Sequence, residues 1–79
     1  MGLDLVEIIA VTEQEFNIII PDEVAVQLMT PRKLIDHVHG NSNLAREFIA
    51  EKIMTIIENE TAQTDFNEDS HFIDDMHLS

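Results

Sequence analysis

The chain has 79 residues, of which 44% are hydrophobic, which suits one small folded domain and leaves no room for a second. Sixteen acidic residues against four basic ones give a formal charge of −12, and a surface of this sign repels phosphate backbones, so we expect no nucleic-acid binding. The chain has no cysteine, which excludes disulfides and thiolate metal sites. No apolar run approaches the roughly 20 residues that span a bilayer, and the acidic N-terminus is unlike a secretory signal, so we expect a cytoplasmic protein without membrane association.

The first predicted helix covers residues 3–16. Its acidic residues near the start, Asp4 and Glu7, suit the positive end of a helix dipole. Apolar residues and one threonine recur at steps of three and four, which indicates a single inward stripe. The stripe consists of Leu5, Ile8, Ile9, Thr12 and Phe16.

Residues 17–40 predict an extended segment and two further helices. Residues 17–21 contain three consecutive isoleucines before a proline, and we expect a loop whose isoleucines fill the core. Asp22 and Glu23 then offer an N-cap and a first-turn acid for a short helix through about Met29. Thr30-Pro31 predicts the start of the next helix, with Leu34, Ile35 and Val38 as its apolar face. Gly40 is placed to end this helix in the left-handed conformation.

The second half of the chain predicts the longest helix and a long polar loop. Residues 41–43 are polar and supply N-caps for a helix over residues 44–59. Its expected inward residues are Leu44, Phe48, Ile49, Ile53, Ile56 and Ile57. Residues 61–70 are polar and acidic, with Phe66 as an apolar anchor and Phe72 and Ile73 as a second one. The prediction is therefore an all-α domain of four helices, one of them short, with a long loop.

Several segments resemble the acyl carrier protein family, in an unusual order. Residues 3–9 (LDLVEII), 13–16 (EQEF), 20–23 (IPDE), 28–30 and 34–38 are similar, in this order and without gaps, to the second half of the family. Residues 50–57 and 65–75 look like its first helix and long first loop. The chain thus resembles a circularly permuted acyl carrier protein in one domain, 1–79, in which 1–40 matches the family's C-terminal half and 41–79 its N-terminal half. The resemblance implies a four-helix bundle with residues 40–43 as the new connector.

The resemblance also implies a cofactor site that this sequence splits between its ends. In the family, a serine at the start of the second helix carries a 4′-phosphopantetheine arm, whose thiol holds an acyl group. Residues 72–79 look like the loop that enters this helix, but Gly2 occupies the serine position and Ser79 lies one or two residues earlier across the break. Three interpretations follow: Ser79 carries the arm, the attachment serine has been lost, or the chain is a pseudo-carrier that only binds partners.

The partner surface implied by the resemblance lies on the first helix. Leu3, Val6 and Ala10 share one face, which is flanked by Asp4, Glu7 and Glu13. This face would dock on basic, partly apolar patches of acyl-handling enzymes in fatty acid or polyketide biosynthesis; the alternative is a purely structural or interaction domain. Thr12 replaces the large aliphatic residue usual at its position, which makes any acyl pocket smaller or more polar.

Other chemistry finds little support in the sequence. His37 and His39 are two residues apart and so fall on different faces of a helix. His71 with Asp74 and Asp75 could attract a divalent ion, but we expect a solvated acidic loop and no dedicated metal site. No nucleophile–histidine–acid arrangement has a recognisable context, so we expect no enzyme activity. Because only five residues separate residues 38 and 44, both a monomer and a helix-swapped dimer are expected possibilities.

Overall fold

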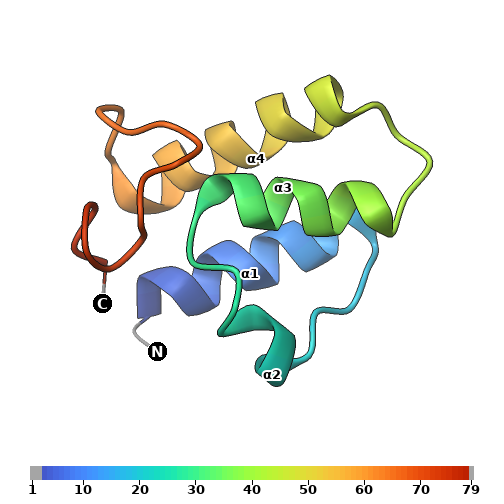
Figure 1. The fold of residues 1–79 in the computed structure, drawn as a ribbon, viewed down its shortest axis with the longest axis horizontal. Coiled ribbons are helices and arrows are strands. Elements are labelled where there is room, and N and C mark those ends of the chain that lie inside the picture. The colour runs from blue at the N-terminus through green and yellow to red at the C-terminus, as the bar shows by residue number, and fades with distance from the viewer. Residues whose placement is uncertain (1–2, 79) are drawn as a thin grey trace.

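The computed structural model describes residues 3–78, and this part of the chain contains four helices and no strand (Figure 1). The helices are α1 (Leu3–Phe16), α2 (Asp22–Ala25), α3 (Pro31–Gly40) and α4 (Arg46–Thr61). After α4, residues 62–78 form a long loop that folds back over the bundle. The predicted all-α class with four helices is thereby confirmed.

The helix α1 has the predicted bounds, and its C-terminal end has an identifiable cause. Asn17 follows the helix with a φ of 53°, in the left-handed region that asparagine tolerates better than most residues. The next amide, that of Ile18, donates to the carbonyl of Glu13 at 3.1 Å. This six-residue closure is a Schellman motif, which satisfies a carbonyl that the helix would otherwise leave unpaired.

The helix α2 is shorter than predicted, and its cap was predicted wrongly. The helix ends at Ala25 rather than near Met29, and Pro21, which makes no side-chain cap, occupies the N-cap position that we expected Asp22 to take. The reason is the Pro21 carbonyl, which accepts from the amides of Val24 and Ala25 at 3.0 and 2.9 Å and so places Asp22 inside the first turn. The expectation that all three isoleucines before it fill the core was also wrong, because Ile19 is 84% exposed.

The helix α3 begins as predicted and ends differently. The Thr30 hydroxyl accepts from the amide of Lys33 at 3.2 Å, and Pro31 takes the first helical position. Gly40, however, does not have a positive φ and is the last residue of the helix. Asn41 terminates α3 instead: its φ is −114°, and its side-chain amide donates to the His37 carbonyl at 2.8 Å.

The helix α4 is displaced by two residues from its predicted bounds. Ala45 takes the N-cap position without a side-chain hydrogen bond, so the polar residues 41–43 do not cap it. Leu44 and Phe48 were wrongly assigned to the inward face, and Phe48 is 47% exposed with the Lys52 ammonium 5.6 Å from its ring centroid. The core-facing residues of α4 are Ile49, Ile53, Ile56 and Ile57.

The core lies between α4, which packs against both α1 and α3, and the loop that covers one end of the bundle. From the loop, Phe72, Met76 and Leu78 are buried, and Phe66 is partly buried against the same core, whereas Ile73 is exposed, contrary to expectation. Two backbone hydrogen bonds of 2.8 Å join the loop to the start of α3, from Arg32 N–H to the Glu68 carbonyl and from Phe72 N–H to the Met29 carbonyl.

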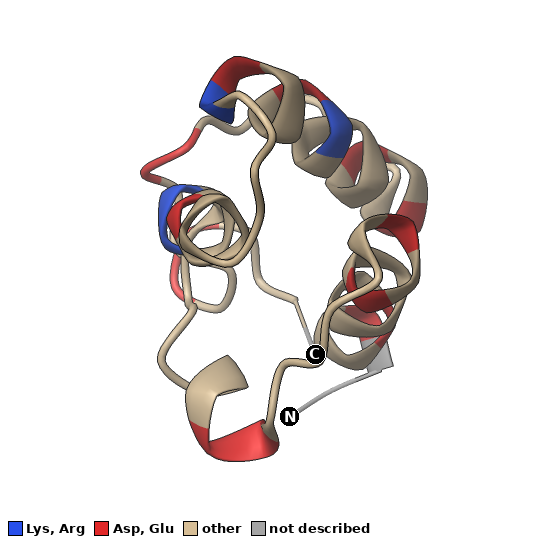
Figure 2. Cartoon of the chain, turned by 90° about the vertical axis from the view of Figure 1, so that its right-hand side faces the viewer, with Lys and Arg blue, Asp and Glu red and all other residues tan. Residues whose placement is uncertain are grey.

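The beginning of α1 and the end of the long loop lie close to each other on the same side of the molecule. The first turn of α1 and the end of the loop are neighbours both in Figure 1 and in the view turned by 90° (Figure 2). None of the helices in residues 3–78 has the length and apolar character required to cross a membrane.

Candidate functional site

Five of the six residues that the sequence predicts for docking lie on α1 outside its core-facing stripe, and the side chain of Leu3, the sixth, lies outside the described part of the structure. Val6 is 43% exposed and Glu7 is exposed, while Asp4 and Ala10 are half-buried beside them. The opposite face of the helix is fixed in the core through Leu5, Ile8 and Ile9. Because the buried face anchors the helix against the core, the opposite face of α1 is turned toward solvent.

A shallow hollow of about 200 Å³ borders this face. It lies between α1, the loop after α1, and α2. Most of its lining residues are apolar, and two are acidic. Its lining residues are Val6, Ile9, Ala10, Glu13, Ile20, Asp22 and Ala25. The predicted docking residues Val6, Ala10 and Glu13 are therefore brought together at one depression.

Glu13 has a structural role that the sequence did not indicate. Its carboxylate oxygen Oε2 accepts a hydrogen bond from the amide of Ile20 at 2.7 Å. Ile20 is buried, so this contact fixes the loop after α1 against the bundle and shapes the hollow. Charge-assisted bonds from a carboxylate to a backbone amide are among the stronger hydrogen bonds in proteins.

The first part of the chain, which includes α1 and α2, carries lysine- and arginine-free, acidic sequence. Residues 3–31 contain six acidic residues and no lysine or arginine, and the basic residues fall on α3 and α4 (Figure 2). The acidic residues are Asp4, Glu7, Glu13, Glu15, Asp22 and Glu23. A surface with this distribution attracts and orients partners that carry basic patches.

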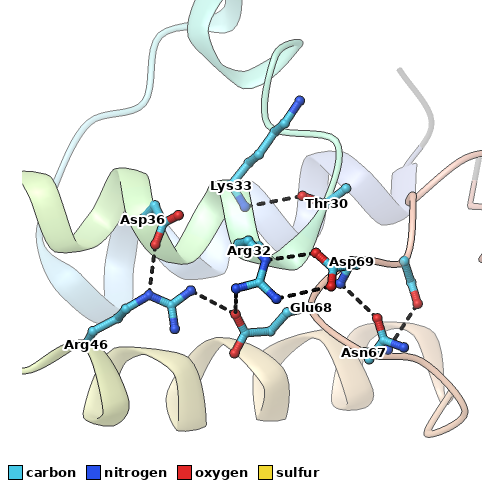
Figure 3. A network of polar contacts seen from close by, with 9 residues as sticks. Thr30, Arg32, Lys33, Asp36, Arg46, Asn67, Glu68 and Asp69 are labelled. Carbon is cyan, nitrogen blue, oxygen red and sulfur yellow. Dashed lines mark hydrogen bonds and ion pairs between the residues drawn. The ribbon is translucent and has the colours of Figure 1, made fainter.

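Both arginines bind acidic side chains of the same chain, in a network that joins the long loop to α3 and α4 (Figure 3). Arg46 of α4 donates to Asp36 of α3 and to Glu68 of the loop, both at 2.8 Å. Arg32 of α3 binds Asp69 through two nitrogens at 2.8 and 3.1 Å and also lies 3.5 Å from Glu68. Glu68 is thus shared between two guanidinium groups.

These contacts change the acidity of the groups involved. The hydrogen bond from Arg32 holds the pKa of Asp69 below its usual value, and the same bond raises the pKa of Arg32. Hydrogen bonds to Glu68 and then to Asp36 raise the pKa of Arg46. The network partners are 10, 22 and 37 residues apart in the chain, and such distant pairings have no signal in the sequence.

Among the described residues, the core beneath the α1 face contains one buried polar side chain. Thr12 is fully buried, as its place in the predicted inward stripe required, and its hydroxyl oxygen has no hydrogen-bond partner. In a helix, a buried threonine hydroxyl usually donates to a carbonyl one turn earlier. Here that bond is not made, so the interior behind α1 is slightly more polar than a purely aliphatic core.

The remaining candidates divide between the loop and the chain ends. His71, Asp74 and Asp75 lie together in the loop, where Nδ1 of His71 is 3.8 Å from Asp74, but no cluster of three or more metal-ligating side chains occurs in residues 3–78. Gly2 and Ser79, the candidates for the attachment position, lie outside the described residues. No protein-family model matches the chain, and no solved structure matches it.

Proposed function

We propose that the chain is an acyl-carrier-like module, in permuted order, that docks on acyl-handling enzymes through α1 and catalyses no reaction itself. The observation that carries this proposal is the outer face of α1: the exposed Val6 and the exposed carboxylate of Glu7 beside a hollow whose lining includes two acidic residues. The partner that fits such a face presents basic side chains around an apolar contact.

The arrangement of the helices supports the permuted order. A permuted chain needs its two ends to be neighbours, and the first turn of α1 and the end of the described loop are neighbours in both views of the molecule. The connector between the two halves, residues 40–43, lies largely on the surface, where a new connection is tolerated. In the proposed assignment, residues 1–40 correspond to the second half of a carrier domain and residues 41–79 to the first.

The cofactor is the point on which two candidate functions differ. A 4′-phosphopantetheine arm is joined through a side-chain hydroxyl and supplies the thiol that holds an acyl group. Gly2 has no hydroxyl and does not fit this chemistry, whereas Ser79 does. An acylated carrier would therefore bear its arm on Ser79. The glycine favours the second candidate, a non-acylated pseudo-carrier that acts only through protein contacts.

Intact mass measured after incubation with coenzyme A and a phosphopantetheinyl transferase distinguishes the two. A gain of the arm that maps to Ser79 and disappears in Ser79→Ala identifies a carrier. If the wild-type chain gains nothing but Gly2→Ser is modified, the scaffold is that of a carrier and only the hydroxyl is missing. Absence of modification in a correctly folded Gly2→Ser chain would contradict a carrier site at this junction.

Docking is tested independently by reversing one charge on α1. Glu7→Lys should weaken binding to a transferase with a basic docking surface by about tenfold at low salt, because a repulsive contact replaces an attractive one. Glu58→Lys makes the same change in net charge at an exposed position on another helix, α4, and should have little effect. Equal effects of the two variants would show that only net charge matters and would overturn α1 as the docking surface.

A further inference from the structure

His71 holds a turn of the loop in a way that depends on its protonation state. Its ring nitrogen Nδ1 accepts hydrogen bonds from the amides of Ile73 and Asp74, both at 3.1 Å. In return, the His71 amide donates to Oδ2 of Asp75 at 2.7 Å. This reciprocal arrangement is similar to the capping box of a helix, with an imidazole as the accepting group.

The turn that His71 caps carries part of the core. Phe72, Met76 and Leu78 are buried, and the turn is closed at its other end by His77, whose φ is 59° and whose amide donates to the Ile73 carbonyl at 3.1 Å. A residue in the left-handed conformation at this position is a common way to end a helical turn. The segment is therefore held at its start by the His71 ring and at its end by the backbone of His77.

An imidazole nitrogen can accept a hydrogen bond only while it carries no proton. The observed bonds therefore require the neutral ring with its hydrogen on Nε2. A proton taken from solvent onto Nδ1 would occupy the lone pair that both amides use, and an N–H group would then face two other N–H groups. Asp74, whose carboxylate oxygen is 3.8 Å away, is the nearest acceptor for the new N–H.

We propose that protonation of His71 opens this turn and loosens residues 72–78, so that the loop is a pH-sensitive element. The charged neighbours of His71 have opposite effects on its imidazolium form. Asp74 and Asp75 attract it. Lys33, which lines with His71 a second hollow that is separate from the one beside α1, repels it. His37 and Asp36 of α3 line the same hollow, and Asp36 is already bound to Arg46. This inference concerns the loop itself and holds whether or not α1 binds an enzyme.

Nuclear magnetic resonance between about pH 5.5 and pH 8, where histidine titrates and aspartate does not, tests the proposal. Nitrogen shifts of the neutral His71 ring should show the Nε2–H form. On protonation, the hydrogen-exchange protection of the Ile73 and Asp74 amides should fall by about fivefold relative to the intrinsic rates, as expected for the loss of a cap. A neutral ring protonated on Nδ1, or protection that does not change with His71 titration, would overturn it.

Variants identify the histidine responsible. His71→Asn provides an accepting oxygen that does not titrate, so the fall in protection should disappear. His39→Asn on the exposed face of α3 and His37→Asn in the shared hollow should leave the fall unchanged. If the fall persists in His71→Asn, or is abolished by His37→Asn, the switch does not reside in His71. Should His71→Asn not fold, the tautomer and the two amides of the wild-type chain decide the question.

Discussion

The hydroxyl of Thr12 is a single polar group inside an aliphatic core, and it is fully buried without a partner. Burying such a group costs free energy because its bonds to water are lost and not replaced. We therefore expect Thr12→Val, which keeps the shape of the side chain, to raise the free energy of unfolding by about 1 kcal/mol. Urea denaturation monitored by circular dichroism measures this change.

Thr55→Val is the matched control for this prediction. Thr55 lies on α4 and is exposed, so its hydroxyl remains solvated, and the same substitution should change the stability by less than about 0.5 kcal/mol. A Thr12→Val variant that is less stable than the wild-type chain would mean that the hydroxyl is satisfied in solution, for example by a backbone carbonyl.

At the scale of helices, the end of α4 is the element with the clearest local strain. Ala62 follows the helix with a φ of 57°, and its amide donates to the Glu58 carbonyl at 2.8 Å. The left-handed conformation suits glycine, whereas a Cβ atom makes it unfavourable. We expect Ala62→Gly to stabilise the protein by about 0.5–1 kcal/mol in thermal or urea unfolding.

The same substitution inside α4 should have the opposite sign. Ala50→Gly places glycine in a helical interior, where it should destabilise by about 1 kcal/mol. If Ala62→Gly destabilised as much as Ala50→Gly, the helix would not end in the left-handed conformation at residue 62.

The helices whose bounds the sequence predicted correctly are those that have local signals. Residues 3–16 show an uninterrupted apolar stripe, and Thr30-Pro31 combines a cap with a favoured first residue, so α1 and the start of α3 follow from neighbours in sequence. The start of α4 has no side-chain cap. Leu44, which precedes the helix, and Phe48, on its outer side, continue the apolar spacing, so periodicity alone placed both in the core.

The candidate site likewise has features that local sequence predicts and features that it does not. The exposed face of α1 could be derived from helical spacing, which relates residues three and four positions apart. The hydrogen bond from Ile20 to Glu13 and the contacts of the two arginines depend on tertiary packing, and nothing in the local sequence distinguishes those carboxylates from the other acidic residues.

At the scale of the whole molecule, two electrostatic effects act on stability in opposite directions. The net charge of −12 destabilises the folded chain by repulsion, and the arginine network stabilises it by attraction. At about 0.01 M salt the screening length is roughly 30 Å, so every charge in a molecule that extends 31 Å along its longest axis repels every other like charge. At about 0.15 M it is roughly 8 Å, and the short contacts of the network persist while the long-range repulsion is screened.

We therefore expect the thermal midpoint to rise as sodium chloride is increased from about 0.01 to 0.15 M, because repulsion of the net charge dominates at low salt. Scanning calorimetry measures the change. Glu58→Gln, which removes one exposed negative charge outside the network, should reduce the salt-dependent rise. A midpoint that falls with added salt would show instead that the arginine contacts outweigh the net repulsion.

The two backbone bonds between the loop and the start of α3 have a consequence for how the molecule comes apart. The amides at the beginning of a helix have no partner within it, and the second residue of α3, Arg32, obtains one from Glu68. Phe72, four residues further along the loop, closes a second bond with Met29. We therefore expect the loop and the first turn of α3 to unfold as one cooperative unit, although the rest of α3 and all of α4 separate them in the sequence. Partial unfolding at either place should release both. The loop thus supplies the hydrogen-bond acceptor that the start of α3 lacks, although it follows that helix start by almost forty residues.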